Sequence, residues 1–293
     1  MTLLQWDFSK LSTVKMQTNT YQIHEDFNNI AVETDVASVV FALSADGKCV
    51  VECYEEEKAK HTVVVEDRTL TVKVADNKAW YDHIGINFSL PKVTVYLPKE
   101  EYVALCMKVN TGNVQLPQEF KFSSIEIAES TGTVNCSASA SGAVKIKTST
   151  GNLCVANMSA GSLDLAVTTG ELAVSNVVCQ GDANIQVTTG DASLTQMTCK
   201  KLTSEGSTGD ILLTNVIAEE KLSVTRSTGN VTFESADAGE IFTETSTGEV
   251  KGTLLSEKSF FVQSNTGKVS VPQTTGGKCE IHTNTGNVKI TLK

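Results

Sequence analysis

The sequence predicts an all-β fold, a β-solenoid with about ten regular coils of 19–20 residues. Two observations predict it. A Thr-Gly dipeptide recurs at intervals of 19 or 20 residues through the last two-thirds of the chain, and apolar residues alternate on both sides of it. The glycines are Gly112, Gly132, Gly151, Gly170, Gly190, Gly209, Gly229, Gly248, Gly267 and Gly286. Such a short period indicates stacked coils rather than one globular core.

Each repeat is predicted to hold two short strands with one face inward. The seventh and fifth residues before each glycine are mostly apolar, as are the second and fourth after it; Leu163, Leu165, Leu172 and Val174 are one such set. This period of two is typical of a half-buried strand, whereas a helix needs 3.6. The glycine is expected at a corner that requires positive φ or close approach of the next coil. The threonine before it has the parity of the inward face, so we expect its methyl group to pack inside.

The N-terminal region lacks the Thr-Gly repeat but keeps short apolar alternating segments. It holds both tryptophans and four of the five tyrosines. We therefore expect residues 1–100 to form an irregular, aromatic-rich β region of degenerate coils and a cap, and residues 101–293 to form the regular repeats. A separate functional domain in residues 1–100 is the alternative. The run Trp80–His83 is interpreted either as a ligand pocket or as an aromatic packing element.

Charge and targeting signals limit the partners. The net charge of −10 argues against nucleic acid, because phosphate contacts need a basic surface. No apolar run approaches the length of a membrane span, so none is expected. The first residues show no basic start followed by an apolar run, which predicts no signal peptide and a cytoplasmic protein. Eight cysteines without a CxxC pair predict neither a metal site nor a cofactor, and favour a reducing compartment.

The motif Ser/Asn-Thr-Gly-Asn/Asp/Glu-Val/Leu-x-Val/Leu, repeated in most coils, resembles that of the bacterial "putative adhesin" family of β-strand-repeat proteins of unknown function. The N-terminal order Glu66–Val72, Val93–Pro98 and Met107–Gly112 is similar to the family's arrangement before its first repeat. The resemblance extends from about residue 28 to the end. It implies a right-handed single-stranded β-helix, no established enzyme activity and, for an adhesin, the cell surface as the alternative location.

Two function classes follow. The first is a non-catalytic binding or scaffold protein whose ligand is a protein or a carbohydrate; the second is a polysaccharide-active β-helix enzyme, which needs clustered carboxylates. The residue after each corner glycine forms an outward polar ladder, in which Glu171, Asp191 and Asp210 are consecutive. This ladder predicts either a weak cation or sugar site or a solvated corner. Cys279 and His282 lie on opposite faces of one predicted strand, so they cannot form a catalytic pair, and no catalytic residue is expected.

Two phenylalanines suggest a surface for association. Phe242 and Phe261 lie six residues before their corner glycines, at an outward position, so we expect them to stack on neighbouring coils as an exposed apolar patch. The last strand, Val288–Lys293, is expected to be an uncovered sheet edge. Together these features predict a homodimer formed through the C-terminal end. The alternative is that another part of the monomer covers the phenylalanines.

Overall fold

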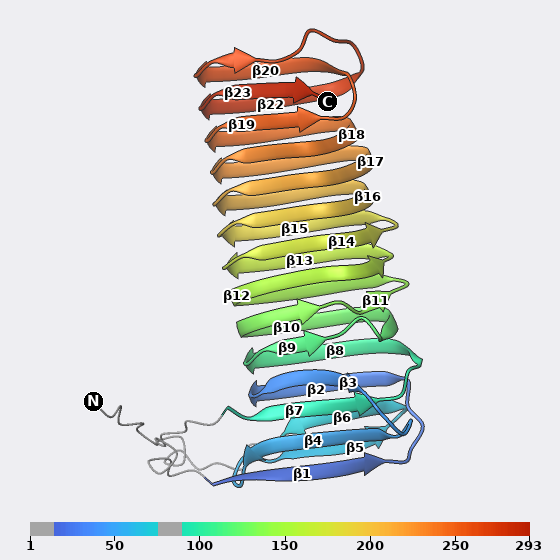
Figure 1. Cartoon of the computed structure of the whole chain (residues 1–293). Coiled ribbons are helices and arrows are strands. Elements are labelled where there is room, and N and C mark those ends of the chain that lie inside the picture. The colour runs from blue at the N-terminus through green and yellow to red at the C-terminus, as the bar shows by residue number, and fades with distance from the viewer. Residues whose placement is uncertain (1–14, 76–89) are drawn as a thin grey trace, which may run out of the picture.

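The computed structural model describes residues 15–75 and 90–293, which form a rod of stacked coils (Figure 1). The predicted all-β solenoid is confirmed: the strands wind into one continuous sheet, and none of the described residues forms a helix long and apolar enough to cross a membrane. The strands are β1 (Met16–Ile23), β2 (Asn29–Val36), β3 (Ser38–Leu43), β4 (Cys49–Glu56), β5 (His61–Glu66), β6 (Thr69–Val74), β7 (Lys92–Leu97), β8 (Glu101–Thr111), β9 (Val114–Leu116), β10 (Lys121–Cys136), β11 (Ser139–Ala140), β12 (Ala143–Ala160), β13 (Ser162–Thr169), β14 (Leu172–Cys179), β15 (Asp182–Thr189), β16 (Ala192–Thr208), β17 (Ile211–Thr228), β18 (Val231–Thr247), β19 (Val250–Leu254), β20 (Lys258–Thr266), β21 (Val269–Ser270), β22 (Gly277–Thr285) and β23 (Val288–Leu292).

Equivalent residues of successive repeats lie over one another in parallel register. Ile146 pairs with Leu165, and Leu165 pairs with Ile185 in the next coil. All three side chains are buried, so neighbouring coils supply the burial that one coil cannot provide alone. The corner glycine is needed for the same close stacking. Gly151 has φ 137°, and a Cβ there would lie only 1.7 Å from the Gly132 carbonyl oxygen.

The threonine of the Thr-Gly pair faces solvent, which corrects the sequence prediction. In the coil that ends at Gly170, Val167 is buried, whereas Thr168 and Thr169 are both exposed. The chain turns at this point, so strand alternation stops two residues before the glycine. The last inward position is therefore the third residue before the glycine, a position that the sequence pattern did not identify.

The N-terminal end of the rod does not follow chain order. Strand β2 pairs in parallel with both β6 and β8, and β3 pairs in parallel with β7 and β9. The coil β2–β3 is therefore inserted between later segments (Figure 1). Beyond it, β4 joins β7, β1 joins β4 and β5 joins β6, all antiparallel. The predicted division at residue 100 coincides with the start of β8, but its status as a domain boundary stays a prediction.

The C-terminal end contains a second insertion. Strand β22 lies between β18 and β20, because Cys279 pairs with Ile241 on one side and with Phe260 on the other. Strand β23 likewise pairs with β19 and β21. The expectation that the last strand is an uncovered edge is therefore wrong: the outermost coil is β20–β21 (Figure 1). The insertion buries Ile281 and Val288, which would otherwise lie at the end of the core.

Candidate functional site

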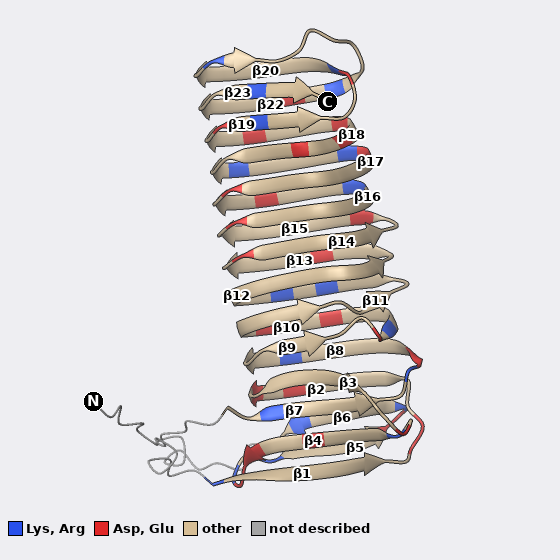
Figure 2. Ribbon diagram, in the orientation of Figure 1, with Lys and Arg blue, Asp and Glu red and all other residues tan. Residues whose placement is uncertain are grey.

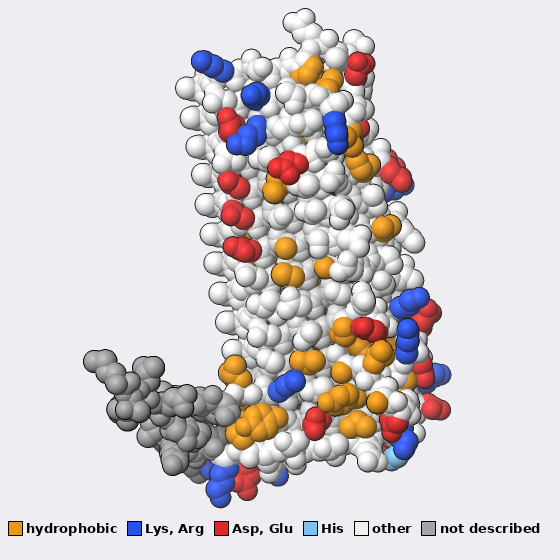
Figure 3. All heavy atoms as spheres, in the orientation of Figure 1, with side chains coloured by type: hydrophobic (Ala, Val, Ile, Leu, Met, Phe, Trp, Pro, Cys, Tyr) orange, Lys and Arg blue, Asp and Glu red, His pale blue; other side chains and the backbone are white. Residues whose placement is uncertain are grey.

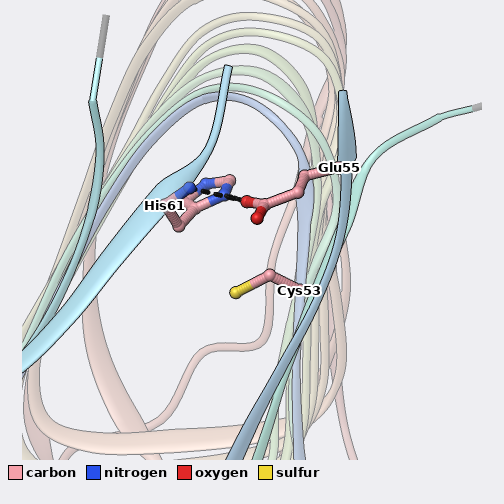
Figure 4. Close-up of side chains that lie close together, drawn as sticks. All are labelled: Cys53, Glu55 and His61. Carbon is pink, nitrogen blue, oxygen red and sulfur yellow. Dashed lines mark hydrogen bonds and ion pairs between the residues drawn. The ribbon is translucent and has the colours of Figure 1, made fainter. Parts of the chain in front are cut away.

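A cysteine, a glutamate and a histidine, residue types common in catalytic and metal sites, meet inside the N-terminal end of the rod. Cys53 and Glu55 point inward from β4, where alternation places them on one face, and His61 begins β5. The Sγ, carboxylate and imidazole atoms that could serve as ligands lie within 4.8 Å of one another. Figure 4 shows the three side chains directed toward one another. Cys53 and Glu55 are 0% exposed and His61 is 4% exposed, so the cluster is buried.

A hydrogen-bond network holds Glu55 and His61 in place. One carboxylate oxygen of Glu55 accepts from the His61 backbone N–H and lies 2.6 Å from Nδ1 of the imidazole. The other oxygen accepts from the Asn19 amide at 2.5 Å. Nε2 of His61 is 3.2 Å from the Thr34 hydroxyl, and the Tyr21 hydroxyl donates to the His61 carbonyl at 2.9 Å. Strands β1, β2, β4 and β5 therefore all position this cluster.

Burial determines the state of the thiol. It raises the pKa of Cys53 to about 12, and the charges of Glu55 and Glu52 act in the same direction. Cys53 is therefore a thiol at neutral pH, and only a strong positive charge beside it would make it a thiolate. A Cys, a His and a carboxylate resemble a nucleophilic triad in composition. A substrate cannot reach a sulfur atom that is fully buried, so this arrangement does not act as a nucleophilic site in the state described.

A shallow groove of about 460 Å³ lies next to the cluster, at the end of the rod. It runs between β1 and β5, the outermost strands of the two sheet faces within the described part of the chain. Tyr21, Ile23, Val63 and Val65 contribute apolar lining, and Glu25 and Glu66 contribute acidic groups. The groove does not open onto Cys53, which contributes no atom to its lining.

The predicted polar ladder is present at the corner and is used for hydrogen bonds between coils. Asp191 accepts from the backbone N–H of Asp210 at 2.8 Å, and Asp210 accepts from that of Asn230 at 2.7 Å. Glu171 donates its own N–H to Asn152 in the coil before it. Figure 2 shows acidic positions recurring along one corner of the rod. The Asp191 and Asp210 carboxylates therefore cap backbone groups of the next coil. A role of this ladder as a cation or sugar site stays a prediction.

The predicted patch of Phe242 and Phe261 is divided by the inserted coil. Phe242 pairs with Glu280 in β22, and Glu280 pairs with Phe261 in β20, so the two phenylalanines are not on neighbouring coils. The Phe242 ring lies 6.1 Å from the His282 ring, and Lys278 Nζ is 5.9 Å from the Phe261 ring centroid. Phe261 remains 58% exposed, whereas Phe242 is only partly exposed. The expected stacking is therefore wrong; a role in association stays a prediction.

Sequence reasoning did not find the Cys53, Glu55 and His61 cluster. The available signal was a change of residue type at the inward positions of β4, where Val51 and Cys53 are followed by a carboxylate at the next inward position. A charged residue in an inward slot needs a partner, and His61 follows Glu55 by six residues. The run Trp80–His83, singled out for its mixed side chains, lies outside the described residues.

Several solved structures resemble this chain at low sequence identity. A crystal structure described as a "putative adhesin" from Parabacteroides merdae is 17% identical, covering 94% of this chain and 96% of that chain, with a TM-score of 0.49. Another from Bacteroides fragilis, also described as a "putative adhesin", is 17% identical over 94% and 97%, with a TM-score of 0.44. A "putative lipid binding protein" from Parabacteroides distasonis is 16% identical over 82% and 95%, with a TM-score of 0.48.

None of the curated proteins compared with the chain matches it. The family model described as Toastrack DUF4097 matches residues 27–233 and 213–292, which together include the inserted coils, the regular repeats and most of the N-terminal end. The chain therefore belongs to the Toastrack DUF4097 family.

Proposed function

We propose that this chain is a non-catalytic binding or scaffold protein. The observation that carries the proposal is the rod itself (Figure 1), in which successive coils pair in parallel register. Equivalent outward positions of successive coils therefore lie over one another and form long rows of side chains along the rod. Such surfaces suit an extended protein or carbohydrate partner. The cluster of Cys53, Glu55 and His61 supports the same conclusion, because it is buried away from any substrate.

The polysaccharide-active alternative is tested directly. Purified full-length protein is incubated with a panel of neutral and acidic polysaccharides, and new reducing ends and unsaturated products are measured. We expect no product above the buffer background, and retention of one or more members of the panel on immobilised protein supports the carbohydrate branch of the proposal. Product formation that Asp191→Asn and Asp210→Asn abolish, in protein that remains folded by circular dichroism, would establish the enzyme alternative and overturn the proposal.

The coil β20–β21, and not the last strand of the chain, forms the C-terminal end of the rod, so the predicted association would take place on this coil. Phe260 and Val262 occupy inward positions of this coil but are only partly buried, and Phe261 and Val269 are 58% and 47% exposed. Strand β20 pairs with β22 alone within the described part of the chain, which leaves its other edge for a further strand. We propose that a second copy of this chain docks there.

Charge indicates which surface of the second copy is used. Residues 250–293 contain six lysines and two glutamates, a net charge of +4, and Figure 3 shows lysines over these coils. Residues 15–75 contain six basic and eleven acidic residues, a net charge of −5. Two C-terminal ends would repel each other, whereas a C-terminal and an N-terminal end attract. In the second copy, the groove between β1 and β5 also offers apolar side chains to the unpaired edge of β20.

Sedimentation velocity from low to high micromolar concentration tests the association. We expect the sedimentation coefficient to rise with concentration, to fall at high salt because screening weakens the attraction, and to stay monomeric for Phe261→Asp/Val269→Asp. The matched control is Val178→Asp, a similarly exposed valine in the middle of the rod at 52%, which should behave as wild type. A wild type that is monomeric throughout would contradict the proposal. An association that salt does not weaken would contradict the head-to-tail arrangement.

A further inference from the structure

The buried cluster has the donor set of a transition-metal site. A thiolate, an imidazole and a carboxylate are the three ligand types that Zn²⁺ prefers in proteins. Here one of each converges from two strands, with the candidate ligand atoms within 4.8 Å of one another. A tetrahedral ion with bonds near 2.0–2.3 Å holds its ligand atoms about 3.3–3.7 Å apart. The present spacing therefore requires small side-chain movements rather than a change of fold.

The groups around the cluster would orient its ligands. The Thr34 hydroxyl lies 3.2 Å from His61 Nε2, which assigns that nitrogen to the hydrogen bond and directs Nδ1 toward Glu55 and the centre of the cluster. The Asn19 amide holds one oxygen of Glu55 and leaves the other facing His61. Metal-bound histidines and carboxylates typically carry such outer hydrogen bonds, because these bonds set the tautomer and the direction of the lone pair.

The charge balance also fits a dication. Glu55 is 0% exposed, and a carboxylate buried in an apolar core is costly unless a positive charge lies beside it. A Zn²⁺ ion that displaces the Cys53 proton brings two positive charges to one thiolate and one carboxylate. The net charge of the buried site is then zero. The released proton passes to solvent. The His61 and Glu55 hydrogen bond at 2.6 Å would open by less than about 1 Å to admit the ion.

We propose that Cys53, Glu55 and His61 bind one Zn²⁺ ion, with a water molecule as the fourth ligand. Strand β4 belongs to the sheet face of β7 and β3, whereas β5 belongs to the face of β6 and β2. The ion would therefore join the two sheet faces at the end of the solenoid, where no further coil holds them together in the described part of the chain. Its role would be structural, since Cys53 and Glu55 are fully buried.

The test begins with the full chain prepared in zinc-containing medium. Metal analysis after gel filtration should give about one zinc per chain. Replacement by Co²⁺ should give a thiolate-to-cobalt charge-transfer band together with the visible bands of a four-coordinate ion. Chelator should lower the melting temperature, and zinc should restore it.

Cysteine variants separate a site from incidental binding. Cys53→Ser should abolish the charge-transfer band and weaken zinc binding by more than about 100-fold. Cys49→Ser, a buried cysteine on the same face of β4 four residues earlier, should keep both properties. Equal behaviour of the two variants would overturn the proposal. If Cys53→Ser fails to fold, wild-type protein decides alone: a folded chain that gives no charge-transfer band with excess Co²⁺ refutes the site, and a band at one equivalent supports it.

Discussion

The guanidinium of Arg226 lies directly over Gly206 and donates to the Val187 carbonyl, two coils away, at 3.2 Å. The three residues occupy the same inward position of successive coils, and a Cβ at Gly206 would lie 1.6 Å from Arg226 Nη1. Arg226 is only 1% exposed, so burial lowers its pKa, while Asp191 and Asp210 at the corner oppose that shift. The missing side chain at position 206 is therefore what admits the arginine to the core.

This relationship predicts opposite effects at the two positions. Gly206→Ala should destabilise the protein by at least about 2 kcal/mol, because the new Cβ meets both Nη1 and the Val187 carbonyl oxygen. Arg226→Met should be nearly neutral or stabilising, because it removes a buried charge whose Nε has no partner among the described residues and fills similar volume. Urea denaturation gives the free energy of unfolding of the two single variants and of the double variant. Recovery of part of the Gly206→Ala loss in Gly206→Ala/Arg226→Met is expected; additive losses would show that the two side chains do not meet.

Inward and outward positions should respond very differently to charge. Leu165→Asp or Ile185→Asp should unfold the rod, since each places an unpaired carboxylate in a slot that is 0–1% exposed. Glu171→Ala should change the free energy of unfolding by no more than about 0.5 kcal/mol, because the side chain is exposed. The hydrogen bond to Asn152 comes from the backbone N–H, which alanine keeps. Thermal melts followed by circular dichroism compare the three variants. Similar losses for Leu165→Asp and Glu171→Ala would contradict the assigned faces.

Glu129 should make the stability depend on pH. It occupies the inward position three residues before Gly132, at 4% exposed, and neither carboxylate oxygen has a hydrogen-bond partner among the described residues. Burial raises its pKa from 4.5 to about 7, an effect that the nearby Thr148 hydroxyl only partly opposes. The folded chain therefore holds this proton more tightly than the unfolded chain. Ionisation of Glu129 therefore costs the folded state stability. This cost is absent below pH 4.5, grows as the pH rises to about 7 and is constant above that.

Replacing this carboxyl group should remove the pH dependence. Glu129→Gln should stabilise the protein by roughly 2–4 kcal/mol above neutral pH and change little in mild acid. The cost of ionising Glu129 is about 1.4 kcal/mol for each unit between its unfolded and folded pKa, and it is fully present only above the folded pKa. Denaturant titrations on both sides of neutrality measure the difference. Glu126→Gln, an exposed neighbour on the same strand whose carboxylate lies 3.7 Å from Lys145 Nζ, is the control and should shift stability little at either pH. A Glu129→Gln effect that is equal at both pH values would contradict the assignment.

Lys258 should hold the outermost coil to the rod. Its ammonium group extends past Gly277 of the inserted coil to the Ala238 carbonyl at 2.6 Å and to Asp237 at 2.7 Å in β18. The side chain is 4% exposed, so the pair is shielded from solvent. Lys258→Met should remove both contacts and accelerate amide hydrogen exchange in residues 258–270, with much less change in the central coils. Lys268→Met, an exposed lysine on the same coil, should leave exchange unchanged. Equal exchange in Lys258→Met and wild type would refute this role.

Much of the core could be predicted because coils repeat the same physical environment. Alternation identified buried positions such as Leu163 and Leu172, and the regular Thr-Gly spacing identified the corners. The parity argument failed for Thr169, because the chain turns two residues before the glycine and breaks the alternation. It also missed the inward position of Glu129 and Arg226, where the residue type varies from coil to coil and no periodic signal exists.

The candidate sites were harder to predict, because they depend on which coils are neighbours. Phe242 and Phe261 are one repeat apart in sequence, yet Glu280 lies between them. The sequence could not show this, since repeats with similar inward faces can pair in more than one order. Cys53, Glu55 and His61 are close in sequence, but their convergence needs β5 to turn away from β4 and join the opposite sheet face through β6.

By itself the sequence determined the solenoid: its period, its two-strand coils, its inward apolar positions and its glycine corners all follow from local alternation and from the backbone freedom that only glycine has. Tertiary structure alone decided the stacking order at both ends. There the inserted coils β2–β3 and β22–β23 bury apolar faces that the outer segments would otherwise leave against solvent. Burial depends on which surfaces meet in space, and a repeat that is nearly the same in every coil carries little information about which neighbour it will meet.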